Sequence, residues 1–158
     1  MNIILTGFMG TGKTSVSNEL AKILGWKILD TDELIIQKEN RSINEIFATD
    51  GEQYFRKIES KIIEHTAKLN NKIISTGGGA VLNPKNIENL KKNGIVFCLS
   101  AKPETIFERL KTDDSRPLLK VENPLKKIKE MLEIRAKFYA NNNYEIDTTD
   151  FSISEIAN

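Results

Sequence analysis

Residues 7–14 of this chain read Gly-Phe-Met-Gly-Thr-Gly-Lys-Thr, and this stretch decides the fold class. It satisfies the pattern G-x-x-x-x-G-K-[ST], the P-loop, in which glycines let consecutive backbone N–H groups turn inward around a phosphate. Lys13 is expected to place its charge between the β- and γ-phosphates, and the Thr14 hydroxyl is expected to hold Mg²⁺. Residues 2–6 form an apolar run typical of a buried strand, and the helical pattern after the loop stops at Gly25. The order strand, glycine loop, helix predicts a nucleotide phosphate site.

Composition sets limits on the class of protein. Hydrophobic residues make up 39% and charged residues 28% of the 158 positions, which is typical of one globular domain over residues 1–158. The formal net charge is +1, so no overall field favours nucleic acid or an anionic membrane as a partner. No apolar run approaches the roughly 20 residues of a membrane helix. Because the first predicted strand begins at residue 2, we expect no signal peptide and a cytoplasmic location.

Two single residues receive a structural interpretation. Cys98 is the only cysteine and lies in the apolar run 95–99, so we expect a buried, unreactive thiol. His65 is the only histidine and lies in an amphipathic helical pattern beside lysines, which indicates a surface position rather than a metal ligand.

Apolar runs alternate with helical patterns along the chain, which predicts an α/β fold with a parallel sheet and helices on both faces. After the first strand, the predicted strands are residues 27–30, 72–75, 95–99 and 144–147. One helix is predicted directly after the P-loop, a short one near residues 34–36, and another after a capping box at Ser42. Four longer helices are predicted at about 52–69, 84–93, 103–111 and 124–141, and a short last helix begins near residue 152 or 154.

Polar residues follow two of these strands at the edge where open α/β sheets bind ligands. Asp30 ends the strand 27–30 and Asp32 follows two residues later, so one could hold Mg²⁺ through water and the other, Asp32, could accept a proton from an attacking hydroxyl. Alternatively, Asp30 or Asp32 caps the next helix. Residues 77–79 are three consecutive glycines, which indicates that a ligand or another part of the chain approaches closely there, with a loose turn as the alternative.

Arginines supply the remaining candidates. Arg56 and Arg135 could each clamp a carboxylate or phosphate, although a single arginine is more often a surface residue. Arg116, in a polar break beside Pro117, suits a lid that closes over the triphosphate. Neither an N-K-x-D base-reading motif nor an apolar strand ending in Asp-Glu is present, which disfavours a switch GTPase and a motor ATPase.

Taken together, the motifs resemble the shikimate kinase family, from the first strand to the last and in order. The matching segments are GFMGTGKT at 7–14, LDTD at 29–32, EQYFRKIE at 52–59, STGGGA at 75–80, SRPLL at 115–119 and RAKFY at 135–139. The resemblance implies a P-loop kinase of three layers, α/β/α, with a five-stranded parallel sheet of order 2-3-1-4-5. It implies a substrate-binding insert at about 31–60 and a lid at about 111–123. The implied reaction is phosphorylation of the 3-hydroxyl of shikimate with MgATP, in aromatic amino-acid biosynthesis. Separately, no long apolar stripe stays exposed once the predicted helices cover the sheet, so we expect a monomeric chain.

The resemblance also assigns roles to residues. ATP contacts fall on Gly10, Thr11, Gly12, Lys13, Thr14, Ser15, Arg109 and Arg116, with Arg109 near adenine. Shikimate contacts fall on Asp32, Arg56, Gly77, Gly78, Gly79 and Arg135, with the two arginines on the carboxylate. Lys13, Asp32 as base and Arg116 would be catalytic, while Thr14, and Asp30 through water, would hold the metal.

Two other interpretations stay open. A kinase for another small acceptor, such as gluconate or a nucleoside monophosphate, would share the P-loop, and arginines alone do not distinguish a carboxylate from a phosphate. Asp32 favours an alcohol, because a phosphate acceptor arrives deprotonated and needs no base. A nucleotide-dependent binding module that no longer catalyses would have lost Lys13, Asp32 or the arginines, and all of them are present.

Overall fold

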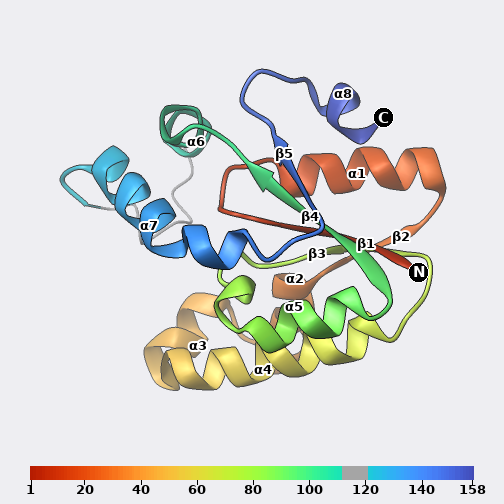
Figure 1. Ribbon diagram of the computed structural model, residues 1–158. Helices are drawn as coiled ribbons and strands as arrows, with labels where there is room; N and C mark the ends of the chain where they lie inside the picture. Colours follow the sequence, from red (N-terminus) through yellow and green to blue (C-terminus); the bar gives the residue numbers. More distant parts are fainter. Residues whose placement is uncertain (112–120) are drawn as a thin grey trace.

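The fold is built around one parallel sheet. The computed structural model describes residues 1–111 and 121–158, so Arg116 and most of the predicted lid lie outside the described residues. The strands are β1 (Asn2–Gly7), β2 (Lys27–Asp30), β3 (Lys72–Ser75), β4 (Gly94–Ser100) and β5 (Tyr144–Asp147). They pair in the order β2-β3-β1-β4-β5, and each pair is parallel (Figure 1). The predicted order 2-3-1-4-5 is confirmed.

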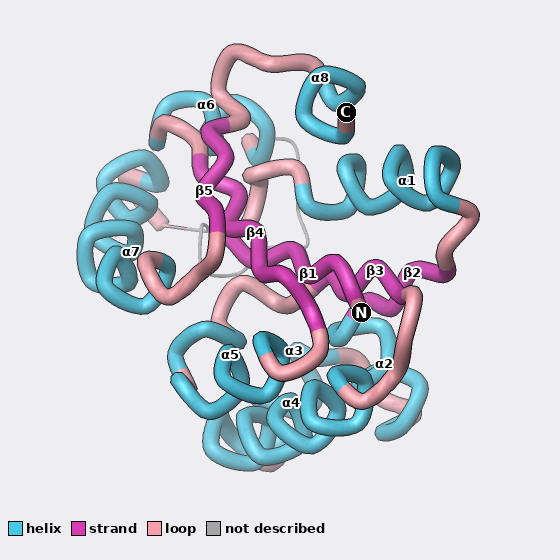
Figure 2. Tube along the Cα trace, turned by 45° about the vertical axis from the view of Figure 1, so that its right-hand side comes forward, coloured by secondary structure: helices cyan, strands magenta, loops and turns pink. Residues whose placement is uncertain are grey.

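Helices cover both faces of the sheet (Figure 2). On one side lie α1 (Lys13–Leu24) and α8 (Ile153–Ala157), which pack against each other. The other side carries α2 (Thr31–Glu39), α3 (Ile43–Thr49), α4 (Gly51–Ala67) and α5 (Pro84–Lys91), with the 3-10 turn η1 (Ala80–Leu82) beside them. The paired helices α6 (Pro103–Leu110) and α7 (Pro124–Tyr139) lie beyond β4 and β5. These are the three layers that the resemblance implied.

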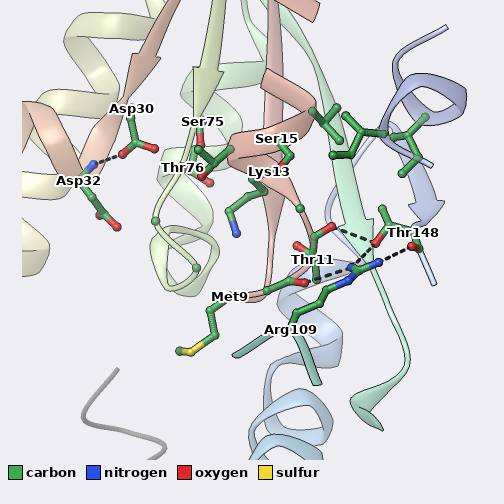
Figure 3. A pocket seen from close by; sticks show the side chains of 18 of the residues that line it. Met9, Thr11, Lys13, Ser15, Asp30, Asp32, Ser75, Thr76, Arg109 and Thr148 are labelled. Atoms are coloured by element: carbon green, nitrogen blue, oxygen red, sulfur yellow. Dashed lines mark hydrogen bonds between the residues drawn. The ribbon is translucent and has the colours of Figure 1, made fainter. Parts of the chain in front are cut away.

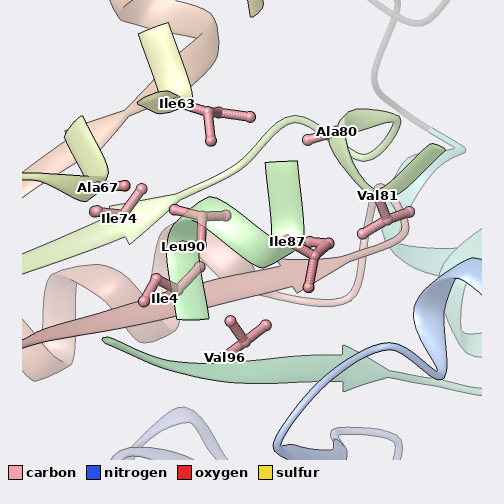
Figure 4. Packing of buried hydrophobic residues seen from close by; sticks show 9 residues of the cluster. All are labelled: Ile4, Ile63, Ala67, Ile74, Ala80, Val81, Ile87, Leu90 and Val96. Atoms are coloured by element: carbon pink, nitrogen blue, oxygen red, sulfur yellow. The ribbon is translucent and has the colours of Figure 1, made fainter. Parts of the chain in front are cut away.

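Successive residues of the central strand point to opposite layers, which is why its sequence is continuously apolar. Leu5 packs with Val16 of α1 and Leu99 of β4 in the core under α1. Ile4 faces the other side, in the larger core cluster that Figure 4 shows. That cluster joins the sheet to α4, α5 and η1 through Ile4, Ile63, Ala67, Ile74, Ala80, Val81, Ile87, Leu90 and Val96.

Local signals in the sequence predicted most boundaries. The bounds of β2, β3 and β5 agree with the predictions, and Ser42 forms the expected capping box with Glu45 at the start of α3. Gly25 ends α1 in the left-handed conformation, at φ 68°. The sequence did not indicate η1. The apolar residues at helical spacing after the P-loop include Ile23, but not all of them face the core, because Ile23 at the end of α1 is 49% exposed.

The two residues that received a structural interpretation behave as expected. Cys98 is buried in β4, where burial raises the pKa of its thiol, and His65 is exposed on α4. Among the described residues, no helix is both long enough and apolar enough to span a bilayer.

Candidate active site

The P-loop joins β1 to α1 through three glycines with positive φ: Gly7, Gly10 and Gly12. Gly7 also meets a packing limit, because a Cβ there would lie 2.2 Å from the carbonyl oxygen of Leu99 on β4. Between the glycines, Phe8 is only 1% exposed and packs among the apolar side chains of α6 and α7. The loop is therefore anchored by a core side chain, a feature that the motif does not reveal.

Lys13 closes the loop on itself. Its Nζ donates to the carbonyl oxygens of Gly7 at 2.8 Å and Phe8 at 2.9 Å. The amine therefore lies at the edge of the loop, where it faces a cavity of about 690 Å³ (Figure 3). We call this the P-loop cavity. Its lining includes Gly10, Thr11, Gly12, Lys13, Thr14, Ser15 and Arg109 from the predicted ATP contacts, together with Asp30 and Asp32.

Arg109 lines this cavity and links the P-loop to Thr148, which follows β5. Its guanidinium donates to the carbonyl oxygen of Gly10 at 3.1 Å, to the Thr148 hydroxyl at 3.1 Å and to the Thr148 carbonyl at 2.8 Å. The Thr148 hydroxyl lies 2.9 Å from the carbonyl oxygen of Thr11 and 3.0 Å from that of Ser100, and can donate to either. Thr148 is buried, so one hydroxyl joins the P-loop, β4, α6 and the end of β5 (Figure 3). The sequence analysis did not identify Thr148 as a residue of the site.

Asp30 and Asp32 have different surroundings, as expected of neighbours at the end of a strand. Asp30 caps α2, and its Oδ1 accepts from the backbone N–H of Asp32 at 2.9 Å and of Glu33 at 3.3 Å. The alternative that Asp30 caps the helix is thus correct for its Oδ1, while the residue still lines the P-loop cavity. Asp32 lies in the first turn of α2 and projects away from Asp30 (Figure 3).

A second cavity of about 530 Å³ lies on the other side of Asp32. We call it the Arg56 cavity. Its polar lining includes Asp32, Arg56, Glu59 and the triglycine loop 77–79, together with Ser42 and Asn44. Its apolar lining includes Phe47 and Phe55. Four residues line both cavities, namely Met9, Asp32, Gly77 and Gly78. A group bound in one cavity therefore lies next to these four residues, and so does a group bound in the other cavity.

The triglycine loop is shaped by side chains of the protein itself. A Cβ on Gly77 would lie 2.5 Å from Asp32 Oδ1, and a Cβ on Gly79 would lie 2.4 Å from a terminal nitrogen of Arg56. The Gly77 N–H donates to the Thr31 hydroxyl at 3.0 Å. The close approach predicted for these glycines is confirmed, and the approaching groups are Asp32 and Arg56. The alternative of a loose turn is wrong.

Arg56 is held by two carboxylates of its own helix. Its Nη1 donates to Glu59 Oε2 at 2.7 Å, and its Nη2 lies 3.3 Å from Glu52 Oε1. Burial raises the pKa of Glu59, and the charge and hydrogen bond of Arg56 counteract this rise. Glu59 escaped the sequence analysis, although an acidic residue within the apolar stripe Phe55, Ile58, Ile62 of a predicted helix was a usable signal.

Arg135 lies on α7, and among the described residues it lines neither cavity. Its guanidinium carbon is 5.9 Å from the centre of the Phe8 ring. It also lies beside Tyr139, whose hydroxyl donates to the carbonyl oxygen of Gly78 at 2.7 Å. The structure thus brings Arg135 to the P-loop and to the triglycine loop, by way of neighbours that the sequence analysis did not identify.

Comparison with known proteins identifies the family. A model of the family described as shikimate kinase matches residues 9–158. The chain is 47% identical to a shikimate kinase of Caldanaerobacter subterraneus subsp. tengcongensis over 156 residues, which cover 99% of this chain and 91% of the relative. This chain belongs to the shikimate kinase family.

Solved structures agree with this assignment. A shikimate kinase from Acinetobacter baumannii in complex with shikimate superposes with a TM-score of 0.92 at 38% identity, over 99% of this chain and 88% of the other. A shikimate kinase from Aquifex aeolicus gives a TM-score of 0.82 at 31% identity, over 99% and 91% of the two chains. The chain is therefore a kinase of the shikimate kinase family with the P-loop kinase fold.

Proposed function

We propose that this chain transfers the γ-phosphoryl group of ATP to the 3-hydroxyl of shikimate, in aromatic amino-acid biosynthesis. The observation that carries the proposal is that Asp32 lines both cavities, with the P-loop on one side and Arg56 on the other. Such an arrangement brings a phosphoryl donor and a hydroxyl acceptor to one carboxylate. Family membership supports the same reaction.

On the donor side, phosphate oxygens would accept from the backbone N–H groups of the P-loop and from Lys13. Lys13 would exchange its two bonds to the carbonyls of Gly7 and Phe8 for bonds to phosphate. Arg109 would bind on the adenine side of the P-loop cavity. Arg116, outside the described residues, would complete the charge neutralisation from the lid.

The oxygen donors at this site fit Mg²⁺. The Thr14 hydroxyl and the Asp30 carboxylate line the same cavity, and Mg²⁺ ordinarily takes few protein oxygens while keeping waters and phosphate oxygens. Thr14 would hold the ion directly and Asp30 through water. When bound, the ion would neutralise charge on the phosphates.

On the acceptor side, the Arg56 cavity offers a guanidinium, a carboxylate and an apolar wall. Arg56 and Arg135 would bind the carboxylate of shikimate, and backbone groups of residues 77–79 would bind its polar edge. Asp32 would orient the 3-hydroxyl and accept its proton as the bond to phosphorus forms. Positioning of the two substrates and neutralisation of the phosphate charge would then account for the acceleration of the reaction.

The test is ADP release, coupled to an indicator reaction, with MgATP and five acceptors: shikimate, quinate, gluconate, AMP and CMP. We expect turnover with shikimate alone. Turnover with gluconate or a nucleotide instead would overturn the acceptor assignment and keep the P-loop, whereas ATP binding without any turnover would favour the binding module. Lys13→Ala should abolish transfer, and Asp32→Asn should lower kcat while ATP still binds. Fractionation and size-exclusion chromatography would test the predicted cytoplasmic location and monomeric state.

A further inference from the structure

Tyr139 ends α7, one helical turn after Arg135. Residues four apart lie on the same face of a helix, so the two side chains are neighbours. The Tyr139 hydroxyl donates to the carbonyl oxygen of Gly78 at 2.7 Å, a contact between residues 61 positions apart. This bond joins α7 to the triglycine loop at a residue that lines both cavities.

The surroundings of the hydroxyl are polar on one side and apolar on the other. Burial raises the pKa of Tyr139 to about 12, and the charge and hydrogen bond of Arg135, together with the charge of Arg56, act in the opposite direction. Both guanidinium groups are thus close enough to influence this one hydroxyl. Its ring packs against two core clusters, the one under α5 and the one around Phe8, which fixes the position of the oxygen.

A buried tyrosine hydroxyl needs a hydrogen-bond partner, so the informative feature is which group this hydroxyl bonds. Here the partner is a carbonyl between Gly77, which packs on Asp32, and Gly79, which packs on Arg56. The hydroxyl therefore lies where three elements of the acceptor side meet: α4, the triglycine loop and α7. Arg135 reaches this junction from α7, although it does not line the Arg56 cavity.

We propose that Tyr139 is a positioning residue of the acceptor site. With its proton committed to Gly78, the hydroxyl oxygen faces Arg135 as an acceptor and holds that guanidinium at the rim of the triglycine loop, where it engages the carboxylate of the acceptor. Tyr139 thereby sets the affinity for an acidic acceptor and the preference for a carboxylate over an uncharged group. This inference rests on the proposed function, because it takes Arg135 as part of the carboxylate clamp.

The test is Tyr139→Phe, which removes the hydroxyl and keeps the ring. We expect KM and the calorimetric Kd for shikimate to rise about tenfold, as for loss of a hydrogen bond in a charged network, while kcat and KM for MgATP stay within about twofold. The methyl ester of shikimate should lose much less affinity, because it presents no carboxylate to Arg135. Tyr144→Phe, which removes the hydroxyl of an exposed tyrosine on β5, is the matched control and should leave KM for both shikimate and MgATP unchanged.

A double-mutant cycle decides whether Tyr139 acts through Arg135. In an Arg135→Ala background, Tyr139→Phe should have little further effect on shikimate affinity. The inference is overturned if the two effects multiply, if the ester and the acid lose the same factor, or if Tyr139→Phe lowers only the melting temperature. These outcomes are separate from failure of the proposed function, which would appear as an absence of shikimate turnover by the unmodified chain.

Discussion

Arg56 donates to Glu59 across 2.7 Å, and the carboxylate that receives this bond is 1% exposed. The second oxygen of that carboxylate, Oε1, has no hydrogen-bond partner within the described part of the chain. A buried carboxylate is costly unless it is paired, so the charge of Arg56 and the burial of Glu59 depend on each other. The buried carboxylate of Glu59 consequently determines the orientation of the Arg56 side chain in the Arg56 cavity.

Replacement of Glu59 should therefore weaken binding of the acidic acceptor more than binding of the nucleotide. For Glu59→Gln we expect KM for the acid to rise about tenfold, because Arg56 loses the buried charge that orients it, while the free energy of unfolding at neutral pH should not fall, because burial disfavours that charge. Initial rates and urea unfolding measure the two effects. The matched control is Glu52→Gln, which removes the exposed partner of the same arginine, and we expect less than a twofold change in KM. Equal effects of the two variants would contradict this account.

The raised pKa of Glu59 gives stability a pH dependence of known sign. The folded chain binds this proton more tightly than the unfolded chain, where the carboxyl titrates near 4.5. The contribution of Glu59 to the free energy of unfolding should therefore decline as the pH rises from about 4.5 through the folded-state pKa, and stay constant above it. Urea unfolding of the unmodified chain and of Glu59→Gln across this range should show the unmodified chain losing stability relative to the variant as the pH rises.

Glu64 on the same helix provides the control of opposite sign. A hydrogen bond from Lys68 lowers the pKa of Glu64, so its contribution is present above the ordinary value of 4.5 and is lost as the pH falls below it. The difference between the unmodified chain and Glu64→Gln should shrink in that acidic range. A trend of the same sign for both glutamates would show that burial does not dominate at Glu59.

Alanine substitutions at Gly77 and Gly79 should distinguish the roles of the two outer positions of the triglycine loop. Gly79 has φ −97° and ψ −2°, which alanine adopts readily, so Gly79→Ala should fold and displace the guanidinium of Arg56. We expect KM for shikimate to rise about tenfold with little change in kcat. Gly77→Ala instead meets Asp32, and there we expect kcat to fall by about tenfold or more. Steady-state kinetics of both variants test this division, and an exchange of the two patterns would refute it.

Thr148 should control the nucleotide side. Thr148→Val keeps the shape and removes the hydroxyl that bonds Arg109 and faces the carbonyls of Thr11 and Ser100, so we expect KM for MgATP to rise about tenfold. Because these contacts lie away from Arg56, KM for shikimate should change less than twofold. Thr148→Ser restores the hydroxyl and should recover most of the affinity. Failure of serine to rescue would mean that the methyl group, rather than the hydroxyl, matters.

The features that the sequence predicted are those encoded by local pattern. The apolar run of β1, the residues Asp30 and Ser75 that end β2 and β3, and the capping box of α3 all depend on neighbours within a few positions. The motifs for the P-loop and the triglycine loop likewise marked the edge of the sheet where both cavities lie.

The features that the sequence did not predict are contacts between distant residues. The bond from Tyr139 to Gly78 and the contact of Thr148 with Thr11 depend on how layers pack, and no spacing in the chain encodes that packing. The burial of Phe8 has the same origin, since the P-loop motif leaves that position unspecified. Such partners become visible only once the helices have been placed against the sheet.

The four residues common to both cavities, including Met9 and Asp32, have a consequence for inhibitor chemistry. One molecule that joins a cyclic hydroxy acid to a nucleotide through a short phosphate bridge would pass directly over these residues. Its two halves would bind as an intramolecular pair, so its affinity would approach the product of the separate affinities multiplied by a high effective concentration. Because the acid half must also satisfy Arg56, such a compound would discriminate against P-loop enzymes whose second site lacks that arginine.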